Sequence, residues 1–435
     1  MRPRAPRHRL KVFAAVAMTG ALALSGCGAN EDDGSNDDSS EVEVFSWWTG
    51  PGEADGLKAM QADFEKKNPG TKFTNAAIAG GSGTQAKAVL ASRLQNNKPP
   101  DSFQGHAGAE LLDYIKAGQI EPLDEFFARN NLYSVYPKQL LDQITYKEHI
   151  YSVPVNIHRS NVLWYNPGIL KDAGIDGPPG SIADFITALK AVDDETDKVP
   201  LSLGAQWTAD HLLESVLLGS LGTDAYNALW EPGADWSTPA VTKALNEFGE
   251  IMKYTTLEAA STDWQGAAKA VVDGKAAFNI MGDWAYGYFV GEAPNGLGKK
   301  LDTDFGYAPS PGTAGTYMWL SDSFTLPKNA PHRGGAIAWL EEVSSKEGQD
   351  LFNPKKGSIP ARTDGDKSLY TGYLKTALEE WTNPATKLAG SFWHGVTANN
   401  KWHTDIDTAV GLFLQNKDVN KLQQGLVNAA ENSGQ

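Results

Sequence analysis

Segments typical of strands and of helices alternate along this chain of 435 residues, and this alternation constrains the fold more than any other feature. The β-rich run 42–45 is followed by Leu57, Met60 and Phe64 at helical spacing, until an Asn-Pro-Gly turn at 68–70 ends the helix. Strands that alternate with helices of about a dozen residues predict parallel sheets with helices on both faces. Because the chain is longer than one hydrophobic core usually supports, we expect an α/β fold with two lobes.

The same pattern continues toward the C-terminus. We expect strands at 102–104, 161–165, 199–203 and 276–281, helices at 85–94, 111–115, 182–192, 266–273 and 333–343, a helix starting near 284, and turns over 353–360. In sheets of this kind, ligands bind at the carboxyl ends of the strands. The residues to examine for a site are therefore 47–53, 104–106 and 156–158.

The N-terminus has the pattern of an export signal. Basic residues precede an apolar run, 12–24, which at about 1.5 Å per residue is too short to span a bilayer core of about 30 Å. Leu24-Ser25-Gly26-Cys27 closes the run and resembles a bacterial lipobox. This resemblance implies that residues 1–26 are a cleaved lipoprotein signal peptide and that Cys27 carries lipid. As the only cysteine, Cys27 has no partner for an intrachain disulfide.

The segment 27–41 is acidic and polar, with no large apolar residue whose burial would offset the entropy of ordering it. We expect a disordered tether that holds an exported globular body away from the cell membrane. Removal of residues 1–26, which contain five basic and no acidic residues, shifts the formal net charge from −15 to −20. A chain this acidic is not expected to bind nucleic acid.

An ordered set of short motifs carries a family resemblance. The motifs are Trp47-Trp48, Pro99-Pro100-Asp101, 118–123 (Gly-Gln-Ile-Glu-Pro-Leu), 151–156 (Tyr-Ser-Val-Pro-Val-Asn), 164–167 (Trp-Tyr-Asn-Pro), 274–278 (Gly-Lys-Ala-Ala-Phe) and Gly282-Asp283-Trp284. Together they resemble the extracellular solute-binding proteins of carbohydrate ABC importers. Within that family the chain is similar to the glucose-type monosaccharide binders, which share Gln104-x-His106, 154–159, 281–284 and 322–324.

The resemblance implies a periplasmic-binding-protein-like fold whose two lobes are joined by a hinge of two or three crossings. Lobe 1 is expected to comprise 42–153 plus about 308–365, and lobe 2 about 154–307 plus 366–435. The implied function is high-affinity capture of a monosaccharide, glucose first, and its delivery to permease subunits in the membrane. A monomer without catalytic activity, cofactor or metal is expected.

Sugar chemistry favours particular residue types for the site. A pyranose has an apolar face and a rim of hydroxyls, so aromatic plates and planar charged or amide groups suit it, and the chain has 13 tryptophans. The predicted ligand-binding residues, several of them carried over from the family, are Trp47, Trp48, Glu53, Gln104, His106, Trp264, Trp284, Asp322, Lys356 and His394.

Each of these residues has a structural alternative. Adjacent side chains on a strand face opposite ways, so one of Trp47 and Trp48 belongs to the core unless the strand ends there. Glu53 could cap a helix, Lys356 could be merely exposed, and His394 could belong to a packed aromatic cluster.

Two other functions stay open at this stage. The ligand could be a disaccharide or an amino sugar, or the chain could be a lipid-anchored glycosidase. A glycosidase needs two carboxylates about 5–10 Å apart, for which Glu53 with Asp322 or Asp283 could serve. The absence of Gly-x-Ser-x-Gly and His-Glu-x-x-His motifs argues against hydrolase chemistry. No phosphate-binding loop is present, since the run Gly80–Gly83 stands alone, so the transport ATPase must be another chain.

Overall fold

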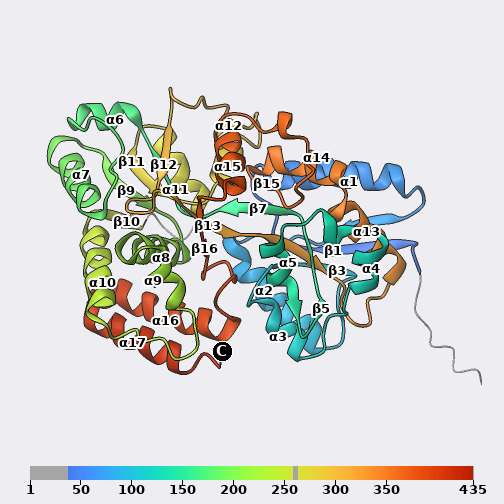
Figure 1. Cartoon of the computed structure of the whole chain (residues 1–435). Coiled ribbons are helices and arrows are strands. Elements are labelled where there is room, and N and C mark those ends of the chain that lie inside the picture. Colours follow the sequence, from blue (N-terminus) through green and yellow to red (C-terminus); the bar gives the residue numbers. More distant parts are fainter. Residues whose placement is uncertain (1–37, 258–262, 435) are drawn as a thin grey trace, which may run out of the picture. The chain divides into compact units, whose positions relative to one another are not determined.

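The computed structural model describes residues 38–257 and 263–434 (Figure 1). The predicted signal peptide, Cys27 and most of the predicted tether lie outside these residues. The described end of the tether bonds to the folded body, where Thr71 Oγ1 donates to the Ser39 carbonyl at 2.8 Å and the Gly335 N–H donates to the Asp38 carbonyl at 3.1 Å. Strand β1 already begins at Glu41.

The first lobe is built on a five-stranded sheet of order β2-β1-β3-β14-β6. Its strands are β1 (Glu41–Phe45), β2 (Lys72–Asn75), β3 (Ser102–His106), β6 (Val153–Pro154) and β14 (Asp322–Thr325). Its helices are α1 (Glu53–Lys67), α2 (Thr84–Gln95), α3 (Leu111–Lys116), α4 (Asp124–Arg129), α5 (Lys138–Ile144), α13 (Arg333–Ser344) and α14 (Lys346–Lys356). Predicted and observed elements differ mainly by a few residues at their ends.

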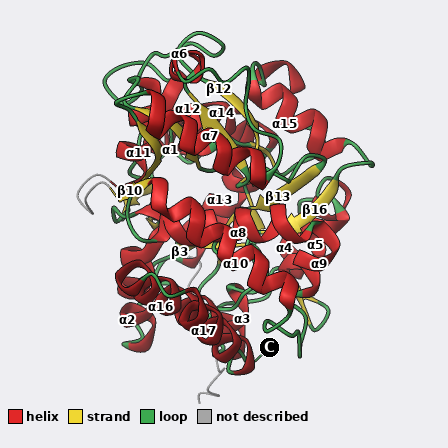
Figure 2. Ribbon diagram, turned by 90° about the vertical axis from the view of Figure 1, so that its left-hand side faces the viewer, coloured by secondary structure: helices red, strands yellow, loops and turns green. Residues whose placement is uncertain are grey.

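The second lobe repeats this plan with the order β10-β9-β11-β8-β12. Its strands are β8 (Val162–Tyr165), β9 (Val199–Leu203), β10 (Thr255–Leu257), β11 (Ala276–Ile280) and β12 (Gly306–Pro309). Its helices are α6 (Pro167–Asp172), α7 (Ile182–Glu195), α8 (Trp207–Leu221), α9 (Thr223–Ala228), α10 (Pro239–Ile251), α11 (Asp263–Val272), α12 (Trp284–Val290), α15 (Tyr373–Thr382), α16 (Asn400–Asn416) and α17 (Val419–Glu431). Helices enclose the strands (Figure 2).

The prediction of parallel sheets holds for only part of each sheet. Strands β2, β1 and β3 are parallel, as are β10, β9 and β11, whereas β14 and β8 run antiparallel to their neighbours β3 and β11. The reason is the direction in which the chain enters these two strands. Both β14 and β8 follow a crossing from the other lobe, so each begins at the sheet edge where its neighbour ends.

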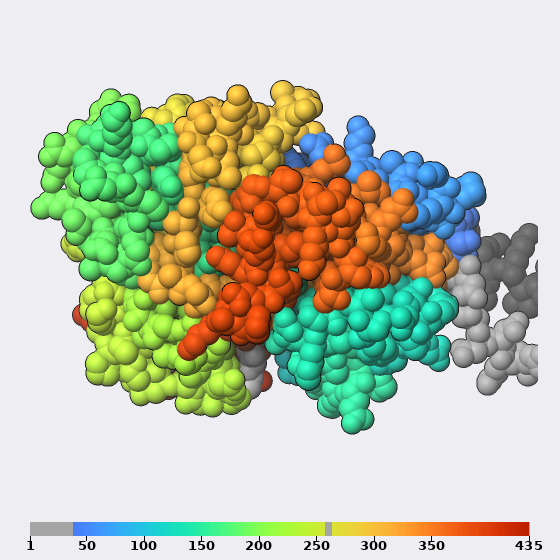
Figure 3. Space-filling view, turned by 45° about the horizontal axis from the view of Figure 1, so that its top comes forward, coloured from blue at the N-terminus to red at the C-terminus, as the bar shows by residue number. Residues whose placement is uncertain are grey.

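A third sheet, of order β15-β7-β13-β16, lies where the chain passes between the lobes. Its strands are β7 (Asn156–Arg159), β13 (Thr316–Leu320), β15 (Ile359–Pro360) and β16 (Lys387–Gly390). The three crossings run through β7, β13 and β15. Residues of the third crossing, orange to red, cover the junction of the lobes in Figure 3. The predicted lobe boundary near 307 falls inside β12, all of which pairs with β8.

The prediction of turns over 353–360 is wrong in its first half. Residues 353–356 form the end of α14, which stops at Gly357 with φ 87°. Asn353 Nδ2 donates to the Val155 carbonyl at 3.0 Å and to the Gln349 carbonyl at 2.9 Å. These two bonds hold the last turn of α14 against the backbone at Val155. Packing thus overrides the local effect of Pro354, which removes one backbone donor. Helix α14 consequently ends at Lys356.

Among residues 38–257 and 263–434, none of the helices combines the length and the apolar character that crossing a bilayer requires.

Candidate functional site

A cavity of about 440 Å³ is lined by residues of both lobes and of the third sheet. Eight of the ten predicted site residues line it: Trp47, Glu53, His106, Trp264, Trp284, Asp322, Lys356 and His394. Most come from the carboxyl ends of strands, the first turns of helices and loops, as expected for a site at strand ends. Asp322 begins β14, whose antiparallel direction brings it beside His106 at the end of β3, and Lys356 ends α14.

Trp48 and Gln104 do not line the cavity. Trp48 is 1% exposed, and its ring packs on Phe324 and Phe352 at centroid distances of 5.3 and 4.4 Å. It is a core residue, because Trp47 and Trp48 point to different sides of the chain just after β1. Gln104 lies behind the cavity wall, where its Nε2 donates to Asp322 Oδ1 at 2.8 Å and its Oε1 accepts from the Trp47 N–H at 3.2 Å.

Glu53 and Lys356 form a buried ion pair on the lobe 1 side of the cavity. Lys356 Nζ lies 2.8 Å from Glu53 Oε1, and their side chains are 4% and 11% exposed. They are the last residue of α14 and the first of α1, two helices that pack together. Glu53 Oε2 accepts the Gly50 N–H at 3.1 Å, and no side chain of the described ranges caps α1. The pair leaves further lone pairs and protons for a ligand.

Asp322 is the first residue of β14 and is held by two amides. Its Oδ1 accepts from Gln104 Nε2 at 2.8 Å and its Oδ2 from Asn156 Nδ2 at 2.7 Å. Asn156 Oδ1 accepts the Asp322 backbone N–H at 2.8 Å. The carboxylate is therefore fixed by neighbouring strands, and each oxygen retains a lone pair that can accept a hydroxyl.

His106 is oriented by a buried charge pair behind it. Its Nδ1 lies 2.7 Å from Glu110 Oε2, which also pairs with Lys87 Nζ at 2.9 Å. Burial disfavours the charged form of Glu110, but Lys87 and His106 outweigh burial and hold the pKa of this carboxyl below its ordinary value. Nδ1 of His106 therefore donates, and Nε2 lies 3.8 Å from Asp322 Oδ1.

The lobe 2 side of the cavity is aromatic. Trp207, Trp264 and Trp284 line it together with His394, whose ring lies 5.1 Å from that of Trp284. Burial, followed by the neighbouring His211, lowers the pKa of His394 well below its ordinary value, so this imidazole is neutral. Lys356 Nζ lies 5.8 Å from the Trp284 ring centroid, which brings a cation of lobe 1 against the aromatic side.

Sequence reasoning missed Trp207 and Asp263, and it marked His158 only as part of the stretch 156–158, not as a binding residue. Trp207 begins α8 shortly after β9 ends, and His158 lies in the 156–158 stretch at a strand end, so position was an available signal for both. Asp263 had no such signal. Its carboxylate accepts from Trp207 Nε1 and from the Gly81 N–H, both at 2.6 Å, and so links the lobes. A Cβ at residue 81 would lie 2.5 Å from Trp207 Nε1, which explains the glycine there.

Beneath the aromatic side lie His211, Glu214 and His394. Among the described residues they are the only group of side chains close enough together to coordinate one metal ion. Protein groups already occupy it. The oxygens of Glu214 accept from Ser391 Oγ at 2.9 and 2.8 Å, and His211 Nε2 donates to the Ser160 carbonyl at 3.0 Å. Burial raises the pKa of Glu214 to about 7. The cluster supports the ring of His394 through Ser391, which lies 2.9 Å from His394 Nδ1.

Comparisons with known proteins agree with this architecture. The pattern of the family described as "Bacterial extracellular solute-binding protein" matches residues 50–350. An "uncharacterized ABC transporter extracellular-binding protein" of Pyrococcus horikoshii is 35% identical over 391 residues, covering 89% of this chain and 87% of that protein. The xylose/arabinose-binding protein XacG of Haloferax volcanii is 30% identical over 377 residues, covering 86% and 80%.

Solved structures share the fold. A chitin oligosaccharide binding protein superposes with a TM-score of 0.77 at 18% identity, over 91% of this chain and 99% of that chain.

Proposed function

This chain belongs to the bacterial extracellular solute-binding protein family as the sugar-binding component of an ABC transporter, and we propose that its ligand is a monosaccharide, glucose first. The sugar is captured between the lobes and delivered unchanged to permease subunits. The observation that supports this most is the pairing of an aromatic side, with Trp207, Trp264 and Trp284, against a hydrogen-bonding side, with Glu53, Asp322 and Lys356.

The residue types match the two surfaces of a pyranose. Tryptophan rings cover the apolar C–H face, while carboxylate oxygens and an ammonium group bind the hydroxyl rim. Hydrogen bonds to charged groups contribute about 1.5–3 kcal/mol each, so a few of them with ring contacts suffice for micromolar or tighter binding. The cavity volume of about 440 Å³ falls in the lower half of the usual range of about 300–1,000 Å³ for ligand sites, which favours one sugar ring.

The charges of the lining residues favour an uncharged ligand. Glu53, Asp263 and Asp322 carry negative charge, and Lys356, already paired with Glu53, is the only Lys or Arg that lines the described cavity. A uronate or a sugar phosphate would meet this excess of carboxylates and bind poorly. An amino sugar is the second candidate, because the same excess attracts an ammonium group.

We further propose that Cys27 anchors the protein to the outer face of the cell membrane, as the lipobox resemblance implies. If so, Cys27→Ala releases the protein from the membrane fraction, and unchanged retention contradicts the anchor.

Isothermal titration calorimetry on residues 28–435 tests the ligand. The panel is glucose, galactose, xylose, maltose, glucosamine and glucuronate, and the sugars are analysed afterwards for hydrolysis. We expect one-to-one saturable binding of glucose, which is recovered intact, and no binding of glucuronate. Binding of maltose alone moves the specificity to disaccharides, and release of glucose from maltose contradicts a binding protein.

A further inference from the structure

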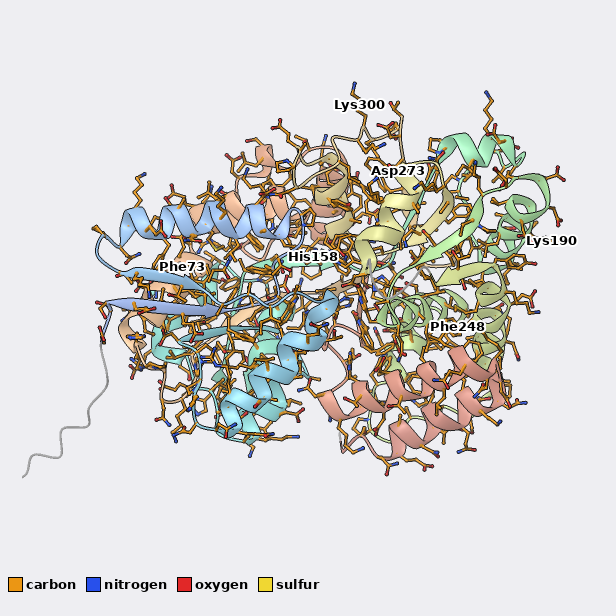
Figure 4. The ribbon with its side chains drawn as sticks, turned by 180° about the vertical axis from the view of Figure 1, so that it is seen from behind. Phe73, His158, Lys190, Phe248, Asp273 and Lys300 are labelled. Carbon is orange, nitrogen blue, oxygen red and sulfur yellow. The ribbon has the colours of Figure 1, made fainter. Side chains whose placement is uncertain are left out.

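The Nε2 atom of His158 is buried beside the cleft and has no hydrogen-bond partner among the residues that the structure describes. His158 lines the cavity, is 1% exposed and lies on β7, near the middle of the molecule in Figure 4. Buried polar groups in native proteins are nearly always paired, so this nitrogen needs an explanation. The surroundings of the two ring nitrogens provide it.

The Nδ1 side of His158 is attached to the aromatic side of the cleft. Nδ1 is hydrogen-bonded to Asp283 Oδ1, and Asp283 Oδ2 accepts the Arg159 N–H at 2.9 Å. Asp283 directly precedes Trp284, the first residue of α12. The rings of His158 and Trp284 also meet nearly at right angles, at 85° and a centroid distance of 5.4 Å. The orientation of His158 is thereby tied to that of Trp284.

The Nε2 side of His158 faces the hydrogen-bonding side of the cleft. Nε2 lies 3.6 Å from Asp322 Oδ2, the oxygen that accepts from Asn156 Nδ2 at 2.7 Å. Asn156 and His158 are two residues apart on one strand, so both side chains project from the same face. The distance of 3.6 Å is about 0.4 Å longer than the upper end of the range of about 2.7–3.2 Å for an N–H···O bond.

The charges around His158 decide which nitrogen carries hydrogen. Burial, then Lys356 and His106, lower the pKa of His158, and burial raises the pKa of Asp283 although Arg159 and Lys356 oppose this. A neutral imidazole whose Nδ1 accepts a hydrogen bond from the protonated Asp283 carboxyl carries its own hydrogen on Nε2. The unpartnered atom is then a donor that faces a carboxylate oxygen.

We propose that His158 is a positioning residue that couples the two sides of the cleft. When the lobes close on a sugar, Nε2–H donates to Asp322 Oδ2 and fixes this carboxylate toward the ligand, while Nδ1 remains on Asp283 beside Trp284. The coupling runs through β7, which is itself one of the three crossings. This inference rests on the proposed function, because the closing motion requires a ligand.

Two substitutions separate the two ends of the side chain. In His158→Asn the amide reaches the position of Nδ1 only, and in His158→Gln it reaches that of Nε2. We expect His158→Asn to raise the Kd for glucose about tenfold or more, the effect of losing a hydrogen bond to a charged group. His158→Gln should bind glucose with a Kd within about threefold of the wild-type value, because its amide can still donate to Asp322 from the position of Nε2.

His149 offers a matched control. Its Nδ1 also lies near a carboxylate, Asp124 Oδ2 at 2.9 Å, but its side chain is 57% exposed and does not line the cleft. His149→Asn and His149→Gln should leave the Kd unchanged. The proposal is overturned if His158→Asn binds like the wild type, or if both His158 variants lose affinity only in parallel with their melting temperature.

A measurement without ligand keeps this inference separate from the proposed function. If the wild type binds no sugar of the panel, the proposed function fails, and the imidazole ¹⁵N spectrum of the mature chain still tests His158. We expect a neutral ring with hydrogen on Nε2 whose signal shifts in Asp322→Asn but not in His149→Gln. A ring with hydrogen on Nδ1 and a bare Nε2 overturns the proposal.

Discussion

The two sides of the cleft are held in place by different forces. On the lobe 1 side, Asp322, His106 and the Glu53–Lys356 pair are fixed by hydrogen bonds and charge pairs from strands and helix ends. On the lobe 2 side, Trp284, Trp207 and His394 are fixed mainly by ring packing around the buried His211. Apart from Trp47 on the first side and Asp263 on the second, one side supplies directional contacts and the other supplies apolar area.

This difference indicates how recognition is divided. Hydrogen bonds depend steeply on distance and angle, so the lobe 1 side reads the positions of the hydroxyls. The free energy of ring contacts is roughly proportional to the buried apolar area and changes little with small displacements. The lobe 2 side therefore contributes affinity but discriminates less between sugars. Substitutions on the first side should change the choice of sugar, and those on the second should weaken all sugars alike.

The largest expected effect distinguishes a cleft tryptophan from a core tryptophan. Trp48→Ala, in the core of lobe 1, should lower the free energy of unfolding by about 3–5 kcal/mol, as for other buried aromatic residues. Trp284→Ala should instead weaken binding of every sugar that binds, with a smaller loss of stability. Denaturant unfolding and calorimetry on both variants measure the two quantities. Equal losses of stability would show that the aromatic side is merely core.

The buried ion pair of the lobe 1 side gives the next effect. Lys356→Met leaves Glu53 without its cation and should cost about 3 kcal/mol of stability, because a buried charge is left unpaired. Adding Glu53→Gln should restore much of this stability, while sugar affinity stays low. Thermal unfolding of the single and double variants checks this. If the double variant is no more stable than Lys356→Met, the unpaired charge of Glu53 is not the cause of the lost stability.

Asp322 provides the sharpest test of the directional side. Asp322→Ala removes the carboxylate that accepts sugar hydroxyls and leaves the amides of Gln104 and Asn156 unpaired, so the Kd should rise about a hundredfold. Asp322→Asn keeps the volume and should change the ranking of sugars epimeric at the contacted carbons. Titration of each variant with glucose and galactose measures this. An unchanged ranking in Asp322→Asn would remove Asp322 from the specificity of the site.

The last expected effect concerns the support beneath the aromatic side. Burial raises the pKa of Glu214 to about 7 from an ordinary value of 4.5, so the folded state holds a proton that the unfolded state has released. Stability should therefore fall as pH rises from about 4.5 to about 7, by about 3 kcal/mol, because the shift of about 2.5 pKa units is worth about 1.4 kcal/mol per unit. Glu214→Gln should flatten this slope in pH-dependent unfolding. Identical slopes in both proteins would exclude Glu214 as the cause.

The fold class and the strand-end placement of the site followed from local pattern, because β-α alternation and turn residues are encoded over a few neighbours. Strand direction did not follow: β8 and β14 are antiparallel because the chain enters them from the other lobe, which no local window contains. The helical end of α14 was missed because Asn353 is anchored by the distant Val155 carbonyl. Asp263 and His158 matter through partners far away in the sequence, Gly81 and Asp322.

The third sheet has a mechanical consequence. The three crossing strands, β15, β7 and β13, lie side by side in a single sheet, so the links between the lobes are themselves hydrogen-bonded to one another. Three linkers that were free would allow the lobes to twist and slide as well as bend. Joined as one ribbon they resist shear and torsion and leave bending as the softest motion. A permease that must tell a loaded carrier from an empty one then has a single coordinate to read: the angle at which this ribbon is folded.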